Sequence, residues 1–271
     1  MGRLHGRRIL ITRPRHQADD LMRRLRAEGA CVSHVPVITI QKPTSYDALD
    51  ARLRDLASYR WVVFTSQNAV WTACARLEAL GSSAEALRSV HVASIGPATS
   101  HLLRAVGVEP LVEPREARAE GLVEAFRAFD LRGVRILLPR SQGARDVLPR
   151  ELRAMGAEVD EVVAYRTEVA YDQRDRLWAV LREGIDALTL MSPSAARALT
   201  ELLGGPRLPE GVRVVCIGPI TAEAARALGL RVDARADVYT AEGLVRTLVD
   251  LFEGREERGV PHTPGPAAAA D

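Results

Sequence analysis

The feature that most constrains this chain is an internal repeat. Residues 6–35 and 133–162 align without a gap at one constant offset, so that Arg13 corresponds to Arg140 and Gly29 to Gly156. Each copy has an apolar run, a polar break with an arginine, an amphipathic stretch, a glycine and a second apolar run. This order predicts a strand, a loop, a helix, a left-handed cap and a strand.

A second repeat occupies the rest of the chain. Residues 62–69 match 188–195, and VHVASIGPAT at 90–99 matches VRVVCIGPIT at 212–221. Stretches with helical periodicity alternate with apolar runs in both copies, and the strand that begins at Val159 is expected to end at Ala164. Repeats of this length indicate duplicated structural units. We therefore expect an α/β fold with two similar domains, each a parallel β-sheet flanked by helices.

The bulk composition is that of a globular protein. The chain has 271 residues, enough for about two domains, with 47% hydrophobic and 27% charged residues. A net charge of +2 and an aromatic content of 4% argue against a surface for nucleic-acid binding, so no nucleic-acid partner is expected.

Cysteine usage and hydropathy predict a cytoplasmic protein. Cys31, Cys74 and Cys216 lack C-x-x-C spacing and are expected to be reduced thiols. No signal-peptide pattern opens the chain, and no apolar run reaches the length of a membrane span, so no membrane partner is expected. The segment 253–271, rich in Gly, Pro and Ala, is predicted to be a disordered tail.

Motifs for cofactor, metal or nucleophilic chemistry are absent from the sequence. There is no G-x-G-x-x-G, no Walker A motif and no G-x-S-x-G, and the histidines form no metal-ligand spacing. We therefore expect no cofactor and no metal. The remaining possibility is a site that holds an anionic substrate in one shape.

Six predicted strands end in similar short loops: T-R-P, T-S-Q-N, G-P-A-T, P-R-S, S-P-S and G-P-I-T. Each places backbone N–H groups, and most place a hydroxyl, at a helix N-terminus, which favours anions. Taken singly, Ser66, Thr99, Ser192 and Thr221 are better explained as N-caps, and a loop arginine as a solvated or structural residue. Taken together, the loops predict one large anion-binding cleft at the carboxyl ends of the strands.

These residues, in this order, resemble the uroporphyrinogen-III synthase family from about residue 8 to 252. The matching segments are ILITRP at 9–14, VVFTSQNAV at 62–70, ASIGPAT at 93–99, the long segment 136–167, LMSPSA at 190–195 and VCIGPITAEAARALGL at 215–230. The resemblance implies that the chain leaves domain one early, builds domain two and returns. Domain one would be residues 1–37 with 169–252, and domain two 41–166. A flexible two-stranded connection would join them, with the active cleft between.

The resemblance also implies a reaction. Hydroxymethylbilane, a linear tetrapyrrole with acetate and propionate on every ring, would lose its hydroxyl as water and close to uroporphyrinogen III with ring D inverted. The protein would be a carbon–oxygen lyase of tetrapyrrole biosynthesis, monomeric and cofactor-free. Handover of the substrate from hydroxymethylbilane synthase is left open.

The resemblance assigns roles to particular residues. Tyr165 matches a family tyrosine implicated as the acid for the leaving hydroxyl, although it could instead pack at the domain junction. Asn68 stands where some relatives have a basic residue, and Ile220 where some have a second threonine. Arg13 and Arg140 are inferred from the repeat and from the anionic substrate. The full set of expected substrate contacts is Arg13, Ser66, Asn68, Thr99, Arg140, Arg145, Ser192, Ser194 and Thr221.

Two other functions remain open. One is a non-catalytic tetrapyrrole-binding regulatory module of the same fold, and the other is a periplasmic-type two-lobed binding protein. Tyr165 and the full set of six loops favour the enzyme, and the lack of a signal peptide disfavours the binding protein.

Overall fold

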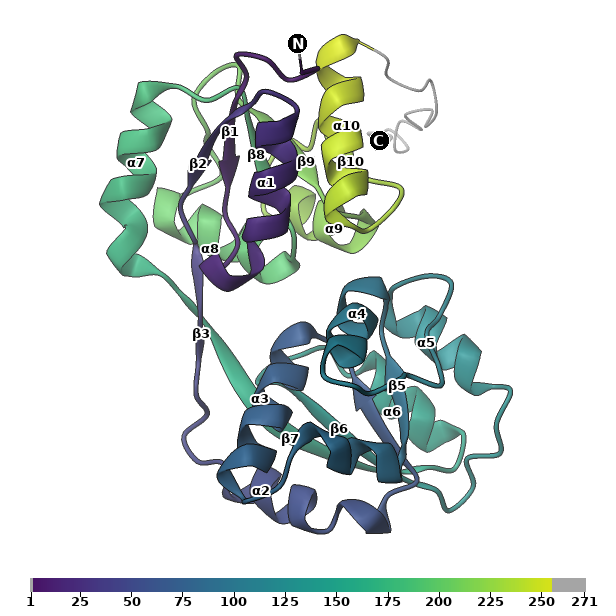
Figure 1. Cartoon of the computed structure of the whole chain (residues 1–271). Coiled ribbons are helices and arrows are strands. Elements are labelled where there is room, and N and C mark those ends of the chain that lie inside the picture. Colours follow the sequence, from purple (N-terminus) through teal and green to yellow (C-terminus); the bar gives the residue numbers. More distant parts are fainter. Residues whose placement is uncertain (1, 255–271) are drawn as a thin grey trace, which may run out of the picture.

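The computed structural model describes residues 2–254, and the predicted tail beyond Gly254 lies outside the described residues. The chain forms two lobes, each built on a five-stranded sheet with helices on both faces (Figure 1). The predicted α/β fold with two similar domains is confirmed. Among residues 2–254, no helix is both long enough and apolar enough to cross a membrane.

Lobe one contains a fully parallel sheet with the order β10-β9-β8-β1-β2. Its strands are β1 (Arg8–Ile11), β2 (Cys31–His34), β8 (Ala187–Leu190), β9 (Arg213–Cys216) and β10 (Ala234–Arg235). One face is covered by α1 (Asp19–Ala27) and α10 (Ala241–Glu253), and the other by α7 (Arg174–Glu183), α8 (Pro193–Leu203) and α9 (Pro219–Ala227). A 3₁₀ turn, Arg15–Gln17, separates β1 from α1.

Lobe two contains a sheet with the order β3-β7-β6-β4-β5. Its strands are β3 (Ile38–Gln41), β4 (Trp61–Phe64), β5 (His91–Ser94), β6 (Arg135–Ser141) and β7 (Glu158–Val169). One face is covered by α2 (Asp47–Arg54), α3 (Gln67–Ala79) and α4 (Pro97–Ala105), and the other by α5 (Ala119–Phe126) and α6 (Val147–Ala154).

The sequence repeat reappears as a repeat of sheet register. Ile9 pairs with Ala187 in lobe one. The residues that the repeat makes equivalent, Ile136 and Trp61, pair in lobe two. The correspondence extends to the sheet edge, where the β9–β10 pairing is matched in lobe two by a single parallel bridge from Ala93. The two lobes are therefore copies of one sheet, and β3 is the added strand.

The lobes are joined by an antiparallel ribbon of β3 and the second half of β7, which spans the gap between them in Figure 1. Ile38 pairs with Val169 at one end of the ribbon and Gln41 with Arg166 at the other. The predicted end of the strand at Ala164 is wrong, because β3 gives β7 a new partner after β6 ends. Ile38 packs into the core of lobe one, whereas Ile40 packs against the core of lobe two.

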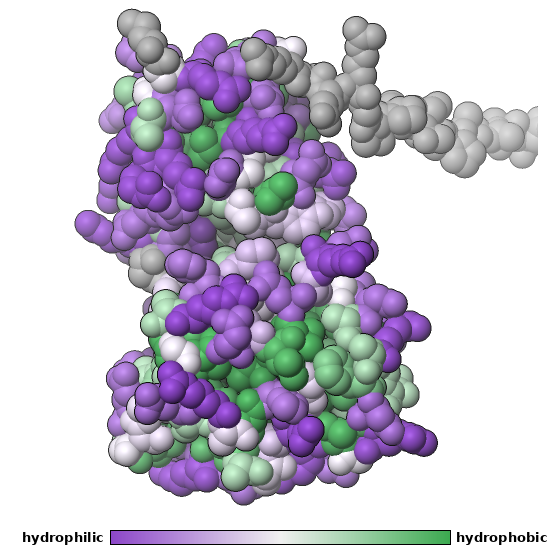
Figure 2. Space-filling view, turned by 45° about the vertical axis from the view of Figure 1, so that its right-hand side comes forward, coloured by the Kyte–Doolittle hydropathy of each residue, from purple (hydrophilic) through white to green (hydrophobic). Residues whose placement is uncertain are grey.

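The direction of the ribbon fixes which edges of the sheets face each other. The chain leaves lobe one after β2, which is parallel to β1, and it leaves lobe two through β7, which is parallel to β6. Both crossings therefore start at carboxyl ends of parallel strands, and these edges face each other across the indented waist seen in Figure 2. The residue limits given above for the two domains stay a prediction.

The start of α10 in lobe one and the equivalent start of α5 in lobe two both depend on a glycine. A Cβ at Gly243 would lie 2.0 Å from the carbonyl oxygen of Val238, and one at Gly121 would lie 2.3 Å from that of Glu116. We expect Gly243→Ala to lower the free energy of unfolding by about 1–3 kcal/mol, because backbone has to shift to relieve the overlap. Urea denaturation measures this. The adjacent exposed substitution Glu242→Ala is the control and should change it by less than about 0.5 kcal/mol. Equal stability of Gly243→Ala and wild type would contradict the steric argument.

Candidate active site between the lobes

Two of the three predicted serines, Ser66 and Ser192, cap helices at the facing edges. Ser66 Oγ accepts a hydrogen bond from the amide of Ala69 at 3.2 Å, and Ser192 Oγ accepts one from Ala195 at 3.1 Å. Ser194 Oγ lies 2.9 Å from Ser192 Oγ. These serines therefore satisfy helix N-termini, as the simpler interpretation of the sequence expects. The same geometry points the first turns of α3 and α8 at the space between the lobes, where their positive dipole ends favour anions.

The two threonines of the Gly-Pro loops are buried rather than exposed to the cleft. Thr99 and Thr221 are only 3% and 4% exposed. Each loop packs instead against the turn before α5 in lobe two or before α10 in lobe one. A Cβ on Gly96 would lie 2.6 Å from the Cβ of Ala117, and one on Gly218 would lie 3.0 Å from the ring of Tyr239. We therefore leave both hydroxyls out of the proposed substrate contacts.

Tyr165 lies within β7, at the point where this strand exchanges β6 for β3. The ring packs in the core of lobe two and is 8% exposed, and its hydroxyl donates a hydrogen bond to Ser66 Oγ at 2.9 Å. The structure thus brings two predicted site residues together beside the N-terminus of α3. The ring has a packing role, and the hydroxyl occupies a polar position at the facing edge.

Arg13 is a mostly buried cation after β1. Its Nη2 donates to Gln17 Oε1 at 2.9 Å and its Nη1 to Met191 Sδ at 3.4 Å, while its buried Nε has no partner among the described residues. No carboxylate of residues 2–254 forms an ion pair with it. Burial lowers the pKa of Arg13 to about 10, which leaves it charged at neutral pH. An incoming carboxylate would supply the missing partner.

Arg140, which the repeat makes equivalent to Arg13, is in a different position. It lies inside β6, 7% exposed, and its guanidinium bonds to Glu161 and to the carbonyl oxygen of Arg145, with Asp146 at 3.4 Å. β6 extends further than β1 because β7 continues beside it, so this arginine is held in the sheet. With its guanidinium already paired, we do not include Arg140 among the proposed contacts.

Arg145 lies in the exposed β6–α6 loop, and its Nη1 is 3.8 Å from Glu120 Oε1. At this distance the ion pair is weak, since its arginine is largely exposed to water. Arg145 is therefore available for a second anionic group.

Gln17 was not predicted as a site residue. Its Nε2 donates a hydrogen bond to Asn68 Oδ1 at 2.7 Å, so it links the 3₁₀ turn of lobe one to the first turn of α3 in lobe two. Its spacing from Arg13, four residues on, is the sequence signal that could have identified it, because side chains one helical turn apart are neighbours.

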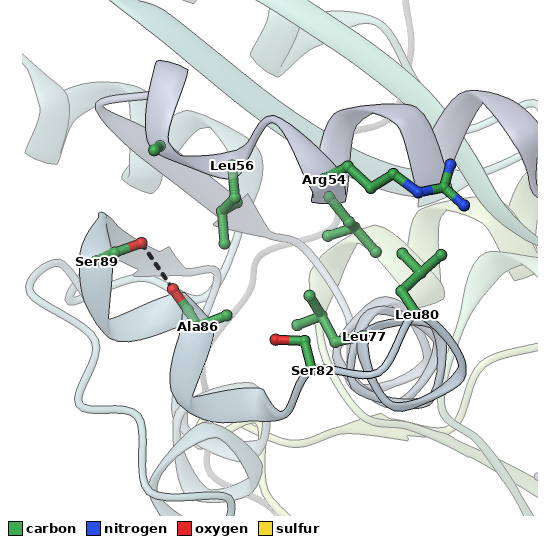
Figure 3. A pocket seen from close by; sticks show the side chains of 9 residues that line it. Arg54, Leu56, Leu77, Leu80, Ser82, Ala86 and Ser89 are labelled. Carbon is green, nitrogen blue, oxygen red and sulfur yellow. Dashed lines mark hydrogen bonds between the residues drawn. The ribbon is translucent and has the colours of Figure 1, made fainter.

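A separate cavity of about 450 Å³ lies in lobe two (Figure 3). It is lined by the C-terminal ends of α2 and α3 and by the segments that follow these two helices, whereas Ser66 and Asn68 are at the opposite end of α3. None of the predicted site residues lines it, so the facing loops stay the candidate site.

Arg13 provides a test of whether binding function was gained at the expense of stability. Replacing this poorly paired buried cation by methionine, which keeps the aliphatic volume, removes a desolvation penalty. We expect Arg13→Met to raise the free energy of unfolding by about 0.5–2 kcal/mol at pH 7. The difference from wild type should shrink as the pH rises through about 10, where Arg13 loses its proton in the folded protein. Thermal denaturation measures both effects, and a lower melting temperature at pH 7 would contradict the assignment.

Comparison with known proteins agrees with this architecture. A family model described as uroporphyrinogen-III synthase HemD matches residues 19–246. A uroporphyrinogen-III synthase from Synechococcus elongatus is 32% identical over 251 residues, covering 89% of this chain and 94% of that protein. One from Chlorobaculum parvum is 25% identical over 250 residues, covering 90% of this chain and 99% of that protein.

Solved structures support the fold. A mutant uroporphyrinogen III synthase from Thermus thermophilus superposes with a TM-score of 0.62 at 17% identity, covering 92% of this chain and 100% of that one. The enzyme from Helicobacter pylori gives a TM-score of 0.58 at 17% identity, covering 89% and 97%. Since the family model spans most of the chain and a relative above 30% identity is covered almost completely, the chain belongs to the uroporphyrinogen-III synthase family.

Proposed function

We propose that this protein converts hydroxymethylbilane into uroporphyrinogen III, with loss of water and inversion of ring D. Family membership supports the reaction. The observation that carries the substrate class is Arg13, a mostly buried guanidinium with no carboxylate partner at an edge that faces the other lobe. A linear tetrapyrrole with acetate and propionate on every ring supplies carboxylates for it and for the helix N-termini.

Catalysis in this proposal depends mainly on orientation. The free substrate closes without inversion, so the protein has to hold ring D where its substituted carbon can attack the azafulvene. Carboxylates bound at both lobes restrict the chain of four pyrroles to a shape close to that of the spiro intermediate. The same restriction excludes the uninverted closure.

Tyr165 is the proposed acid for the departing hydroxyl. Its O–H bond breaks as the C–O bond breaks, so that water leaves, and the proton is recovered when the macrocycle loses one on aromatisation of the inverted ring. A neutral phenol adds no negative charge beside a polycarboxylate, whereas an aspartate would repel it and a histidine is often unprotonated at neutral pH. In the free protein the Tyr165 hydroxyl donates its hydrogen bond to Ser66 Oγ. In the complex the leaving hydroxyl of the substrate would replace Ser66 as the acceptor.

We also propose a cytoplasmic monomer that needs no cofactor. Cys31, Cys74 and Cys216 are free thiols, which fits a reducing compartment. Among residues 2–254, the exposed large apolar side chains come from four separate segments: Leu111, Val163, Tyr171 and Val238.

One assay tests the reaction. The protein is incubated with freshly generated hydroxymethylbilane, the products are oxidised, and the type I and type III isomers are separated. We expect type III with the native protein and type I with heat-denatured protein, because the uncatalysed closure does not invert ring D. Type I alone with native, folded protein would contradict the proposal.

The role of Tyr165 is tested by removing only its hydroxyl. We expect Tyr165→Phe to slow type III formation by about 10²-fold, the lower end for general acid catalysis, since water can replace part of the function. Tyr171→Phe is a matched control, because that phenol is 60% exposed and bonds to Glu201 on the surface. If Tyr165 only packs, Tyr165→Phe should keep the full rate while Tyr165→Ala lowers the melting temperature.

A further inference from the structure

A continuous series of hydrogen bonds crosses between the lobes at the facing edges. Arg13 Nη2 donates to Gln17 Oε1 at 2.9 Å, and Gln17 Nε2 donates to Asn68 Oδ1 at 2.7 Å. A guanidinium has no acceptor, so it can only face the oxygen of the Gln17 amide. The amide nitrogen is thereby directed at lobe two. Arg13 thus fixes the orientation of the Gln17 side-chain amide, which links the two lobes.

The series continues on the other side to the proposed acid. Asn68 is in the first turn of α3, two residues after Ser66, which caps that helix. Ser66 Oγ in turn accepts the hydrogen bond from Tyr165 at 2.9 Å. A short rigid turn therefore separates the interlobe hydrogen bond from the phenol. Arg13 and Tyr165, which come from different lobes, are connected through Gln17.

We propose that Gln17 is a positioning residue, which transmits the placement of Arg13 to the first turn of α3 and so sets the distance between the anion-binding arginine and Tyr165. The expected effect of Gln17 on catalysis rests on the proposed function, whereas its effect on the distance between the lobes does not. Arg13 Nε has no partner among the described residues, so a substrate carboxylate can bind there while Nη2 keeps its bond to Gln17. A bound carboxylate restrains the guanidinium, and with it the whole series.

The link has a specific effect on product identity. If lobe two is poorly positioned relative to the carboxylates held by lobe one, the azafulvene can close before ring D is in place for inversion. Loss of the link should therefore increase the fraction of type I product, as well as lowering the rate. Free substrate also closes to type I, so the type I product formed without protein has to be subtracted. After this subtraction, a residue that only stabilises the fold would leave the ratio of isomers unchanged.

Two substitutions distinguish loss of the interlobe link from a change of charge at Gln17. Gln17→Ala removes both, and the binding of the carboxylate by Arg13 remains. Gln17→Glu keeps an acceptor for Arg13, and the Asn68 amide can rotate to donate to it, so the link persists while the new carboxylate competes with the substrate. We expect Gln17→Ala to lower kcat about threefold to tenfold, the loss of about one hydrogen bond, with KM nearly unchanged. Gln17→Glu should instead raise KM.

The experiment that tests the proposal measures the interlobe distance without substrate. Fluorophores are attached to Arg23→Cys in lobe one and Arg127→Cys in lobe two, both exposed positions, in a Cys31→Ser background. Energy transfer is then compared for wild type, Gln17→Ala, Gln17→Glu, Asn68→Ala and the double alanine variant. Gln173→Ala is the matched control, since its side chain bonds to the neighbouring Asp172 on the surface. The isomer ratio is measured for the same unlabelled proteins.

We expect Gln17→Ala and Asn68→Ala to broaden the distance distribution equally, the double variant to add nothing, and Gln17→Glu and Gln173→Ala to match wild type. Gln17→Ala should also release more type I product. An unchanged distance distribution in both alanine variants would overturn the proposal. If the distances change but wild-type protein makes no type III product, the assigned reaction fails and the interlobe link stands.

Discussion

The ribbon of β3 and β7 is the constraint on which the rest of the molecule depends. Each strand leaves one lobe at the carboxyl end of a parallel sheet, so joining them antiparallel places the two carboxyl edges opposite each other. In parallel sheets these edges carry the loops that lead into helix N-termini. The ribbon thus makes these two edges the facing walls of the candidate site. Apolar residues of the ribbon, Ile38 and Ile40, anchor it in different cores.

Duplication of the sheet did not duplicate the site. The equivalent arginines have opposite environments: Arg140 is neutralised by Glu161 within β6, whereas Arg13 is mostly buried without a carboxylate. The turns that pack on the two Gly-Pro loops differ as well, with Ala117 in lobe two and Tyr239 in lobe one. An asymmetric linear substrate, of which only one ring inverts, needs a cleft whose two walls are different. The repeated backbone supplies the frame, and the side chains break its symmetry.

The site combines groups that stabilise the fold with groups that do not. Ser66 and Ser192 cap helices, and the ring of Tyr165 is part of a core, so the fold holds these groups in place before any substrate arrives. Arg13 is the opposite case, because burial without an anion costs stability and lowers its pKa. The proposed binding of a polycarboxylate depends on this combination of preorganised neutral groups with a poorly paired buried cation.

The sequence by itself determined the order of strands and helices, because apolar periodicity and glycine caps are local signals. Gly29 and Gly156 end their helices with φ of 83° and 90°, as the repeat predicts. It also placed the polar loops at one edge, since carboxyl ends of parallel strands lie together. Only the tertiary structure decided that Arg140 is paired, that Thr99 and Thr221 are buried, and that Gln17 meets Asn68. Those outcomes depend on which loops meet in space, and this is fixed by the length and pairing of the ribbon rather than by any local pattern.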